Sequence, residues 1–258
     1  MITRYRAALN DKQLDAVAAD IMITDISYTA PIPQIVASAL AGRNGMHVQG
    51  KTYGVASVTV SFEIHEANVS KRQEACKKIQ GWARQGGWLT TNDKAGLRLR
   101  VECSALPEIR SALRWTDKLS VTFTAYDSPM WESIFPEVMT LTGAANSAEQ
   151  YMDGTADSTP VDVAVKNTGG TAIESVTVYA GDTVITLENV ELGAGKSMYI
   201  GHTTEGFLYI RVDNASKLHR RTAESSDDLI VKCGHQSVFG YVCDGEASVT
   251  FTARGRYV

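Results

Sequence analysis

One stretch of this 258-residue chain, from residue 55 to 126, constrains the fold more than any other part. Apolar and polar residues alternate over 57–64, 97–103 and 119–125, the pattern of strands with one buried face. Between the first two runs, an apolar stripe recurs at helical spacing; its members are Ala75, Cys76, Ile79, Trp82 and Ala83. Because each element has a single apolar face, the sequence predicts antiparallel sheets with one helix packed on them.

The limits of this helix, at about 70–85, follow from its flanking residues. Ser70 and Gln73 have the spacing of a capping box, which satisfies two backbone N–H groups at a helix start. Gly86 and Gly87 tolerate positive φ and predict where the helix stops.

The segment 31–36 is apolar but does not fit an ordinary strand. Two prolines this close exclude a central strand, and the connection on to Gly54 shows no regular pattern. Two interpretations stay open: a loop tucked against its own sheet, or an arm that packs on a neighbouring copy. The second makes this segment the candidate oligomer interface, with Pro31, Ile32, Pro33, Ile35 and Val36 as its residues.

The second half of the chain has a different character. Small and polar residues over 136–160 indicate a linker, and from 161 to 258 short alternating runs follow one another between turn signals. Such runs predict a β-sandwich. We therefore expect three parts: a domain over 1–135 with one helix, a linker over 136–160, and a β-sandwich over 161–258. The fold class is mainly β, with an α+β N-terminal domain.

Motifs for chemistry are missing from the sequence. It has no nucleotide-binding glycine loop, no nucleophile elbow and no histidine pair at zinc-binding spacing. The four cysteines form no CxxC pair, and we expect free thiols that act as small buried apolar residues. Glu224, Asp227 and Asp228 fit a solvated turn better than a calcium loop. The sequence thus predicts no enzyme, no catalytic residue, no metal and no cofactor.

The net charge and the positions of the aromatic residues limit the classes of partner that the sequence favours. The net charge of −4 argues against nucleic acid as a specifically bound partner, and no apolar run approaches the roughly 20 residues that span a bilayer. The tryptophans lie in and around the predicted helix and strands, where core or interface packing is favoured over sugar stacking; they are Trp82, Trp88, Trp115 and Trp131.

Four stretches resemble the distal tail protein family of siphophage-type tails, which is also found in prophages. They are DIMITDI (20–26), SVTVSFEI (57–64) with the helix to Trp82 and GWL (87–89), LSVTFTAYDSP (119–129), and SVTFTARGRY (248–257). The third departs from the family pattern F-x-A-x-D-P because Ser128 stands before Pro129. The order and spacing of the four stretches carry the resemblance across nearly the whole chain.

The resemblance implies a structural hub at the tip of a phage tail. Family members form a hexameric ring through the N-terminal domain and carry a galectin-like β-sandwich at the periphery. The ring joins the tail tube protein to the tail-tip or tail-fibre protein, and DNA passes through its channel without specific binding. By the same resemblance, the protein is made in the bacterial host cytoplasm and ends in the virion, at the tail tip, with no membrane partner. The alternative is a lectin-like module that binds host cell-wall carbohydrate, and this alternative requires exposed aromatic residues on the sandwich.

Overall fold

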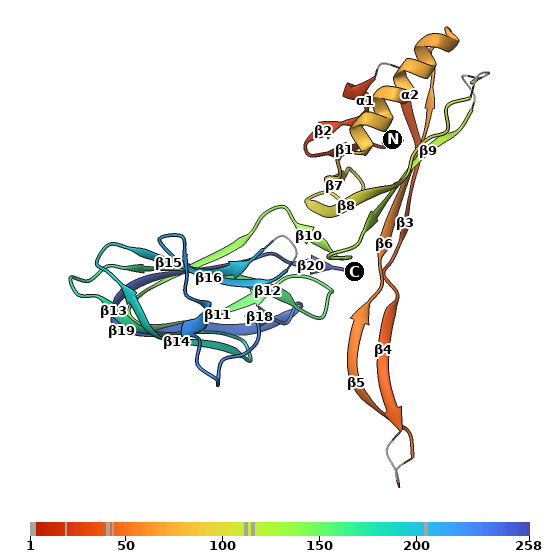
Figure 1. The fold of residues 1–258 in the computed structure, drawn as a ribbon. Coiled ribbons are helices and arrows are strands. Elements are labelled where there is room, and N and C mark those ends of the chain that lie inside the picture. Colours follow the sequence, from red (N-terminus) through yellow and green to blue (C-terminus); the bar gives the residue numbers. More distant parts are fainter. Residues whose placement is uncertain are drawn as a thin grey trace. The chain divides into compact units, whose positions relative to one another are not determined.

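The computed structural model describes residues 4–18, 20–39, 42, 44–110, 113–114, 117–203 and 206–258. It divides into two compact units, Met1–Trp131 together with Val258, and Glu132–Tyr257. Both consist mainly of antiparallel strands (Figure 1), so the predicted fold class is confirmed. No helix in the described part of the chain is long and apolar enough to cross a membrane.

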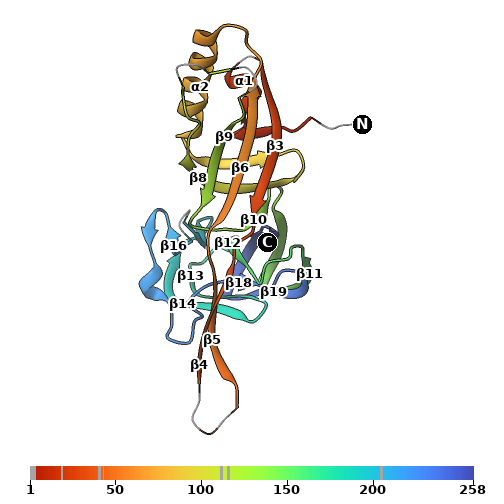
Figure 2. The same ribbon diagram turned by 90° about the vertical axis from the view of Figure 1, so that its right-hand side faces the viewer.

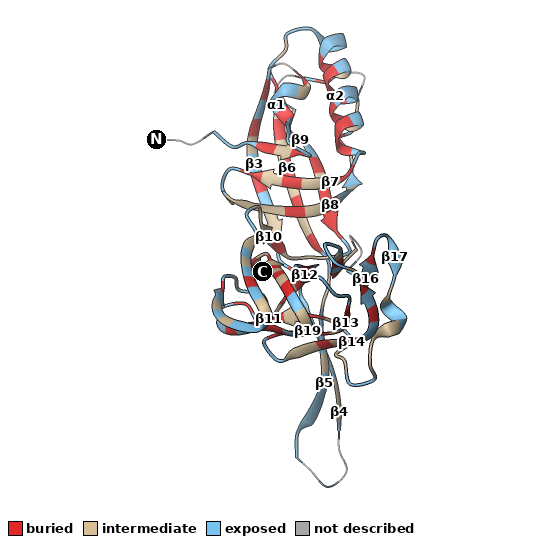
Figure 3. Ribbon diagram, turned by 90° about the vertical axis from the view of Figure 1, so that its left-hand side faces the viewer, coloured by how far each residue is buried: buried red, intermediate tan, exposed pale blue. Residues whose placement is uncertain are grey.

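The first unit is built on a sheet with strand order β2-β1-β7-β8-β9-β6-β3. The strands are β1 (Ala7–Leu9), β2 (Lys12–Gln13), β3 (Ile21–Thr29), β6 (Ala56–Ile64), β7 (Gly87–Thr91), β8 (Leu97–Ala105) and β9 (Leu119–Ala125). Along β6 every second residue is buried, as its alternation predicts, and the buried positions appear as red bands in Figure 3. The three strands expected from period-2 runs are therefore confirmed.

Two helices accompany this sheet, the short α1 (Leu14–Val17) and the longer α2 (Val69–Ala83). The predicted apolar stripe of α2 is buried from Ala75 to Ala83, and the Trp82 ring meets Phe123 of β9 edge-to-face at 5.8 Å. Gly86 and Gly87 have φ angles of 59° and 114°, which confirms the predicted helix stop.

The predicted capping box at the start of α2 is wrong. The N-cap is Asn68, whose Oδ1 accepts hydrogen bonds from Ser70 N at 2.9 Å and Lys71 N at 3.3 Å. Gln73 donates instead to the carbonyl oxygen of Arg110. Asparagine two residues upstream satisfies the first N–H groups, because its short amide reaches them directly.

The segment after β3 forms a hairpin and not an irregular loop. Strands β4 (Pro33–Ala39) and β5 (Met46–Tyr53) pair only with each other in a two-stranded sheet. Figures 1 and 2 show this ribbon continuing from the ends of β3 and β6, at the end of the first unit away from α2. We call β4 and β5 together the arm.

The second unit is a β-sandwich formed by one continuous, folded sheet. Its strand order is β14-β13-β19-β12-β15-β16-β17, with β11 also paired to β19 and β18 to β12. The strands are β11 (Glu137–Met152), β12 (Thr159–Asn167), β13 (Ile173–Ala180), β14 (Thr183–Leu192), β15 (Ser197–His202), β16 (Leu208–Val212), β17 (Ala215–Ser216), β18 (Ile230–Val231) and β19 (His235–Ala253), with the 3₁₀ turn η1 (Leu218–Arg220). Two short strands, β10 (Trp131–Ser133) and β20 (Arg256–Tyr257), complete the chain.

Strand β19 has 19 residues and holds the sandwich together. Its first part pairs with β13 and its last part with β12, so one strand belongs to both layers. Alternate residues point into the core, where the rings of Phe239 and Phe251 meet at 5.7 Å.

The expected linker over 136–160 is wrong for most of its length. Residues Glu137–Met152 form the 16-residue strand β11, which pairs with β19 from Glu137 to Met152 with one irregularity at Gly143/Ala145. Only Leu141 and Met152 of this strand are buried. The other residues of this exposed strand are mostly small or polar, which is why its sequence resembles a linker.

Candidate assembly surface

The arm has two faces of different character. Cross-strand partners point to the same side of a hairpin, and the register pairs Ile35 with Lys51, Ala37 with Val48 and Ala39 with Met46. One face, here called the apolar face, therefore carries Pro33, Ile35, Ala37, Ala39, Met46, Val48, Lys51 and Tyr53. The other carries Gln34, Val36, Ser38, His47 and Thr52, and on it Gln49 Nε2 donates to Ser38 Oγ at 3.0 Å.

The apolar side chains of the arm are exposed. Ile32, Ile35, Val36, Met46 and Val48 are between 54% and 71% exposed, and in Figure 3 the arm lacks the buried bands seen along β6. An isolated two-stranded hairpin is marginally stable in water at best, and clustered exposed apolar residues mark interaction sites. The arm therefore has the composition of a surface that a partner covers.

The base of the arm is well defined. Gly54 N donates to the carbonyl oxygen of Ile32 at 2.9 Å, and the Lys51 ammonium lies 4.8 Å from the centre of the Tyr53 ring.

The described strands of the arm carry no carboxylate, since Lys51 and His47 are their only titratable side chains apart from Tyr53. The arm therefore presents a neutral to weakly basic apolar surface.

The five residues selected from the sequence lie at the start of this arm. Ile32, Pro33, Ile35 and Val36 are exposed, whereas Pro31 is buried. Exposure excludes the alternative of a loop tucked against its own sheet. Sequence reasoning missed Met46 and Val48 on the returning strand, because a register shift opposite Val36/Ala37 interrupts the alternation that would have revealed them.

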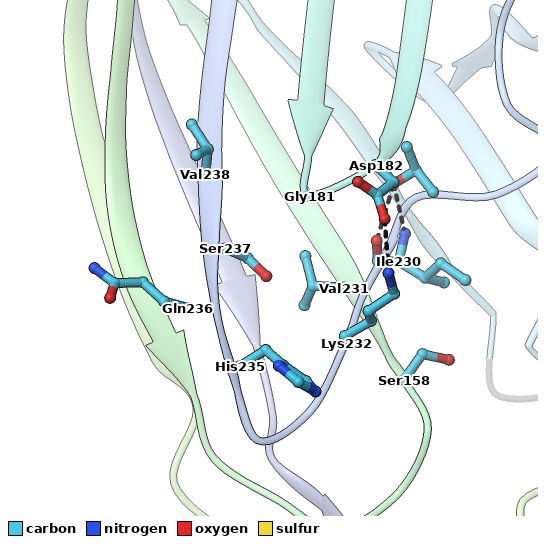
Figure 4. A pocket seen from close by; sticks show the side chains of 11 residues that line it. Ser158, Gly181, Asp182, Ile230, Val231, Lys232, His235, Gln236, Ser237 and Val238 are labelled. Atoms are coloured by element: carbon cyan, nitrogen blue, oxygen red, sulfur yellow. Dashed lines mark hydrogen bonds and ion pairs between the residues drawn. The ribbon is translucent and has the colours of Figure 1, made fainter.

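A cleft of about 390 Å³ lies in the second unit, between the β13–β14 turn, β18 and the start of β19 (Figure 4). Lys232 Nζ pairs with Asp182 Oδ2 at 2.9 Å on its rim, and both side chains are exposed. The described lining residues include His235 but no tryptophan, tyrosine or phenylalanine. This cleft therefore lacks the large aromatic ring on which lectin sites commonly stack a sugar.

A buried histidine joins three distant parts of the sandwich. His202 Nδ1 lies 3.0 Å from Asp162 Oδ1, and His202 Nε2 contacts Asp228 Oδ1. Burial opposes the charged imidazole, but the hydrogen bonds that its two ring N–H groups donate to the carboxylates of Asp162 and Asp228 outweigh it and raise the pKa of His202 to about 9. The imidazolium therefore links β12, the end of β15 and the loop before β18. Asp228, expected in a solvated turn, belongs to this cluster.

The cysteines and the described tryptophans singled out in the sequence lie mainly in the core or pack against neighbouring side chains. Cys76, Cys233 and Cys243 are buried, Cys103 is partly buried, and all four are free thiols. Trp82 and Trp131 are buried, while Trp88 stacks under the Arg98 guanidinium at 3.9 Å; Trp115 lies outside the described residues. Among the described residues no group of three or more potential ligands is placed to hold a metal ion.

Comparisons with known proteins agree on the fold. No protein-family model and no curated protein sequence matches the chain. The Dit protein (gp 19.1) of phage SPP1, described as a paradigm of the hub adsorption apparatus in phages that infect Gram-positive bacteria, superposes with a TM-score of 0.71 at 8% identity, covering 99% of this chain and 100% of that one. The chain has the fold of SPP1 Dit.

A second solved structure, the baseplate of phage P2 in its activated conformation with calcium, contains a chain that matches with a TM-score of 0.50 at 8% identity. That match covers 99% of this chain and 98% of the baseplate chain. The resemblance expected from the four sequence stretches is therefore confirmed at the level of the fold, over both units.

Proposed function

We propose that this protein is a structural subunit of a phage tail tip, where it forms the hub between the tail tube protein and the tail-tip or tail-fibre protein. The observation that carries the proposal is the likeness to SPP1 Dit along the entire chain, because both units and their order are shared. On this proposal the protein resides in the virion, after synthesis in the host cytoplasm, as part of a phage or prophage.

The hub assembles as a ring, and we propose six copies. The arm supports self-association, since its exposed apolar face has no cover within the described part of the chain. In this ring Ile32, Pro33, Ile35 and Val36 contact a neighbouring copy, and Pro31 sets the direction in which the arm leaves the sheet. DNA passes through the central channel without sequence-specific contacts.

A carbohydrate-binding module and an enzyme are less well supported. The cleft described above has no tryptophan, tyrosine or phenylalanine in its described lining, and the exposed aromatic residues Tyr151, Tyr199 and Phe207 of the second unit lie outside it. His202 uses both ring nitrogens on carboxylates, so neither nitrogen is available to activate a nucleophile. A scaffold role requires neither kind of site.

The test is the assembly state of the purified full-length chain. Light scattering combined with negative-stain imaging should show particles near six times the chain mass of 28.0 kDa, as rings with a central hole. Pull-down against the tail tube and tail-tip proteins of the same phage genome should retain both. A chain that stays monomeric at every concentration, alone and with these two proteins, would overturn the proposal.

A further inference from the structure

The paired strands β15 and β16 carry aromatic side chains on the outer face of the sandwich (Figure 1). Alternate residues of both strands are buried in the core, so Tyr199, Tyr209 and Arg211 lie on the outer face. Tyr199 is 52% exposed, and Phe207, two residues before Tyr209, is 71% exposed. We call these four residues the aromatic patch. Large apolar side chains that gather at the surface mark an interaction site.

Arg211 lies between two tyrosines of the patch. It is directly opposite Tyr199 in the β15–β16 register, and its guanidinium lies 5.1 Å from the centre of the Tyr209 ring. The Tyr209 ring in turn packs closely on the backbone of β15, since a Cβ on Gly201 would lie 2.9 Å from Tyr209 Oη. These contacts limit the orientations of the guanidinium, so less side-chain entropy is lost when its N–H groups bind a ligand.

The patch also has positive charge that the described residues leave unneutralised. Arg211 and the exposed Lys166 of the neighbouring strand β12 pair with no carboxylate of a described residue. Asp162 and Asp213, at the margins of this face, are already paired with a histidine and a lysine of the same unit, each at 3.0 Å. The free charge of the patch is therefore positive, on a chain whose net charge is −4.

These groups fit an acidic protein segment better than other ligands. A guanidinium forms two parallel N–H···O bonds with one carboxylate, and tyrosine, phenylalanine and arginine are enriched in the core of protein interfaces. Two free cations do not make the concentrated basic face that a run of phosphates requires. The free charged groups of the patch are donors only, whereas sugar hydroxyls also require acceptors.

We propose that the aromatic patch docks an acidic segment of a different tail protein, with a carboxylate on Arg211 and an adjacent apolar side chain against Tyr199 and Phe207. This inference rests on the proposed function, since it names a surface through which the hub holds a partner. The arm of a second copy does not supply the acid, because its described strands carry no carboxylate.

Binding measurements with purified tail proteins test the docking. Full-length chain is titrated with the tail tube protein and with the tail-tip or tail-fibre protein of the same phage genome. At least one complex should have a Kd that Arg211→Gln raises tenfold or more, and Tyr199→Ser should weaken the same complex. The control Lys232→Gln changes an exposed cation of the same unit, outside the patch, and should leave the Kd unchanged.

Carbodiimide crosslinking locates the contact, because the reagent joins an ammonium group to a carboxylate beside it. Lys166 should couple to an aspartate or glutamate of the bound tail protein. Complexes that are insensitive to both Arg211→Gln and Tyr199→Ser overturn the inference and leave the hub proposal standing. Crosslinks from Lys166 to a second copy alone also overturn it, as does binding to a glycan array that these variants abolish while the protein complexes persist. A wild-type chain that forms no rings and binds neither tail protein overturns both proposals.

Discussion

Ile35 of β4 lies directly opposite Lys51 of β5, and both side chains project from the apolar face of the arm. Lys51 is in turn stacked over Tyr53. A cation thus lies within reach of any acidic group introduced at position 35. This geometry allows the packing role of the arm to be removed while its two strands stay paired.

Ile35→Glu should therefore keep the arm folded and abolish self-association. The new carboxylate faces Lys51, and an opposite-charge cross-strand pair stabilises a hairpin by roughly 0.2–1 kcal/mol. Burying that carboxylate in an apolar contact costs enough to weaken the Kd more than about tenfold. Sedimentation velocity measures the change. Gln34→Glu, on the opposite face of the same strand, is the matched control and should assemble as wild type; equal loss in both variants contradicts the two-faced arm.

Asn68→Ala should destabilise the first unit by about 1 kcal/mol, because the hydrogen bonds to Ser70 N and Lys71 N are lost. Ser70→Ala should change stability by less than about 0.5 kcal/mol, since Ser70 is inside the helix. Urea unfolding followed by circular dichroism compares the two variants. The reverse order of effects would restore the capping box at Ser70 and Gln73.

Arg72 is a buried cation on α2 whose role is structural. Its Nε and Nη2 donate to Leu113 O at 3.0 and 2.8 Å, and its Nη1 donates to Ala67 O at 2.8 Å. Arg72→Met leaves these carbonyl groups unpaired and should destabilise the first unit by about 2–4 kcal/mol. Lys78→Met, on the exposed side of the same helix, should cost less than about 0.5 kcal/mol. Equal urea midpoints for the two variants would show that the hydrogen bonds from Arg72 to Leu113 O and Ala67 O do not stabilise the first unit.

The His202 cluster should make the second unit sensitive to alkaline pH. The pKa of His202 is about 9 in the folded chain against an ordinary value of 6.5. Its contribution is thus fully present below pH 6.5 and declines as pH rises to about 9. We expect the stability difference between wild type and His202→Gln to fall by on the order of 2 kcal/mol across this window. Thermal unfolding at pH 6, 8 and 10 measures it. A difference independent of pH would exclude a charged His202.

Much of the first unit could be predicted because its elements each have one buried face. The alternation over 57–64 and the helical spacing from Ala75 to Ala83 arise from contact with one core, and the structure buries those positions. The arm and β11 lack this contrast, because most of their side chains are exposed on both sides. Apolar periodicity arises where one face of an element is buried. A strand exposed on both faces therefore shows little alternation of apolar and polar residues in its sequence.

The contacts that join distant residues could not be predicted at all. Asp162 and Asp228 lie 40 and 26 residues from His202, and only the folded sheet brings the three together. Asn68 was missed for a local reason, since Ser70 and Gln73 match a capping pattern that starts two residues later. The number of cysteines and the lack of known catalytic motifs, in contrast, are read directly from the sequence.

Residues 221–226 occupy the outer side of β14, so that edge of the sandwich is closed to a foreign strand. Contact between copies then depends on other surfaces such as the arm. A head-to-tail contact through the arm ends in a ring when the rotation from one copy to the next closes, and continues into a filament when it does not.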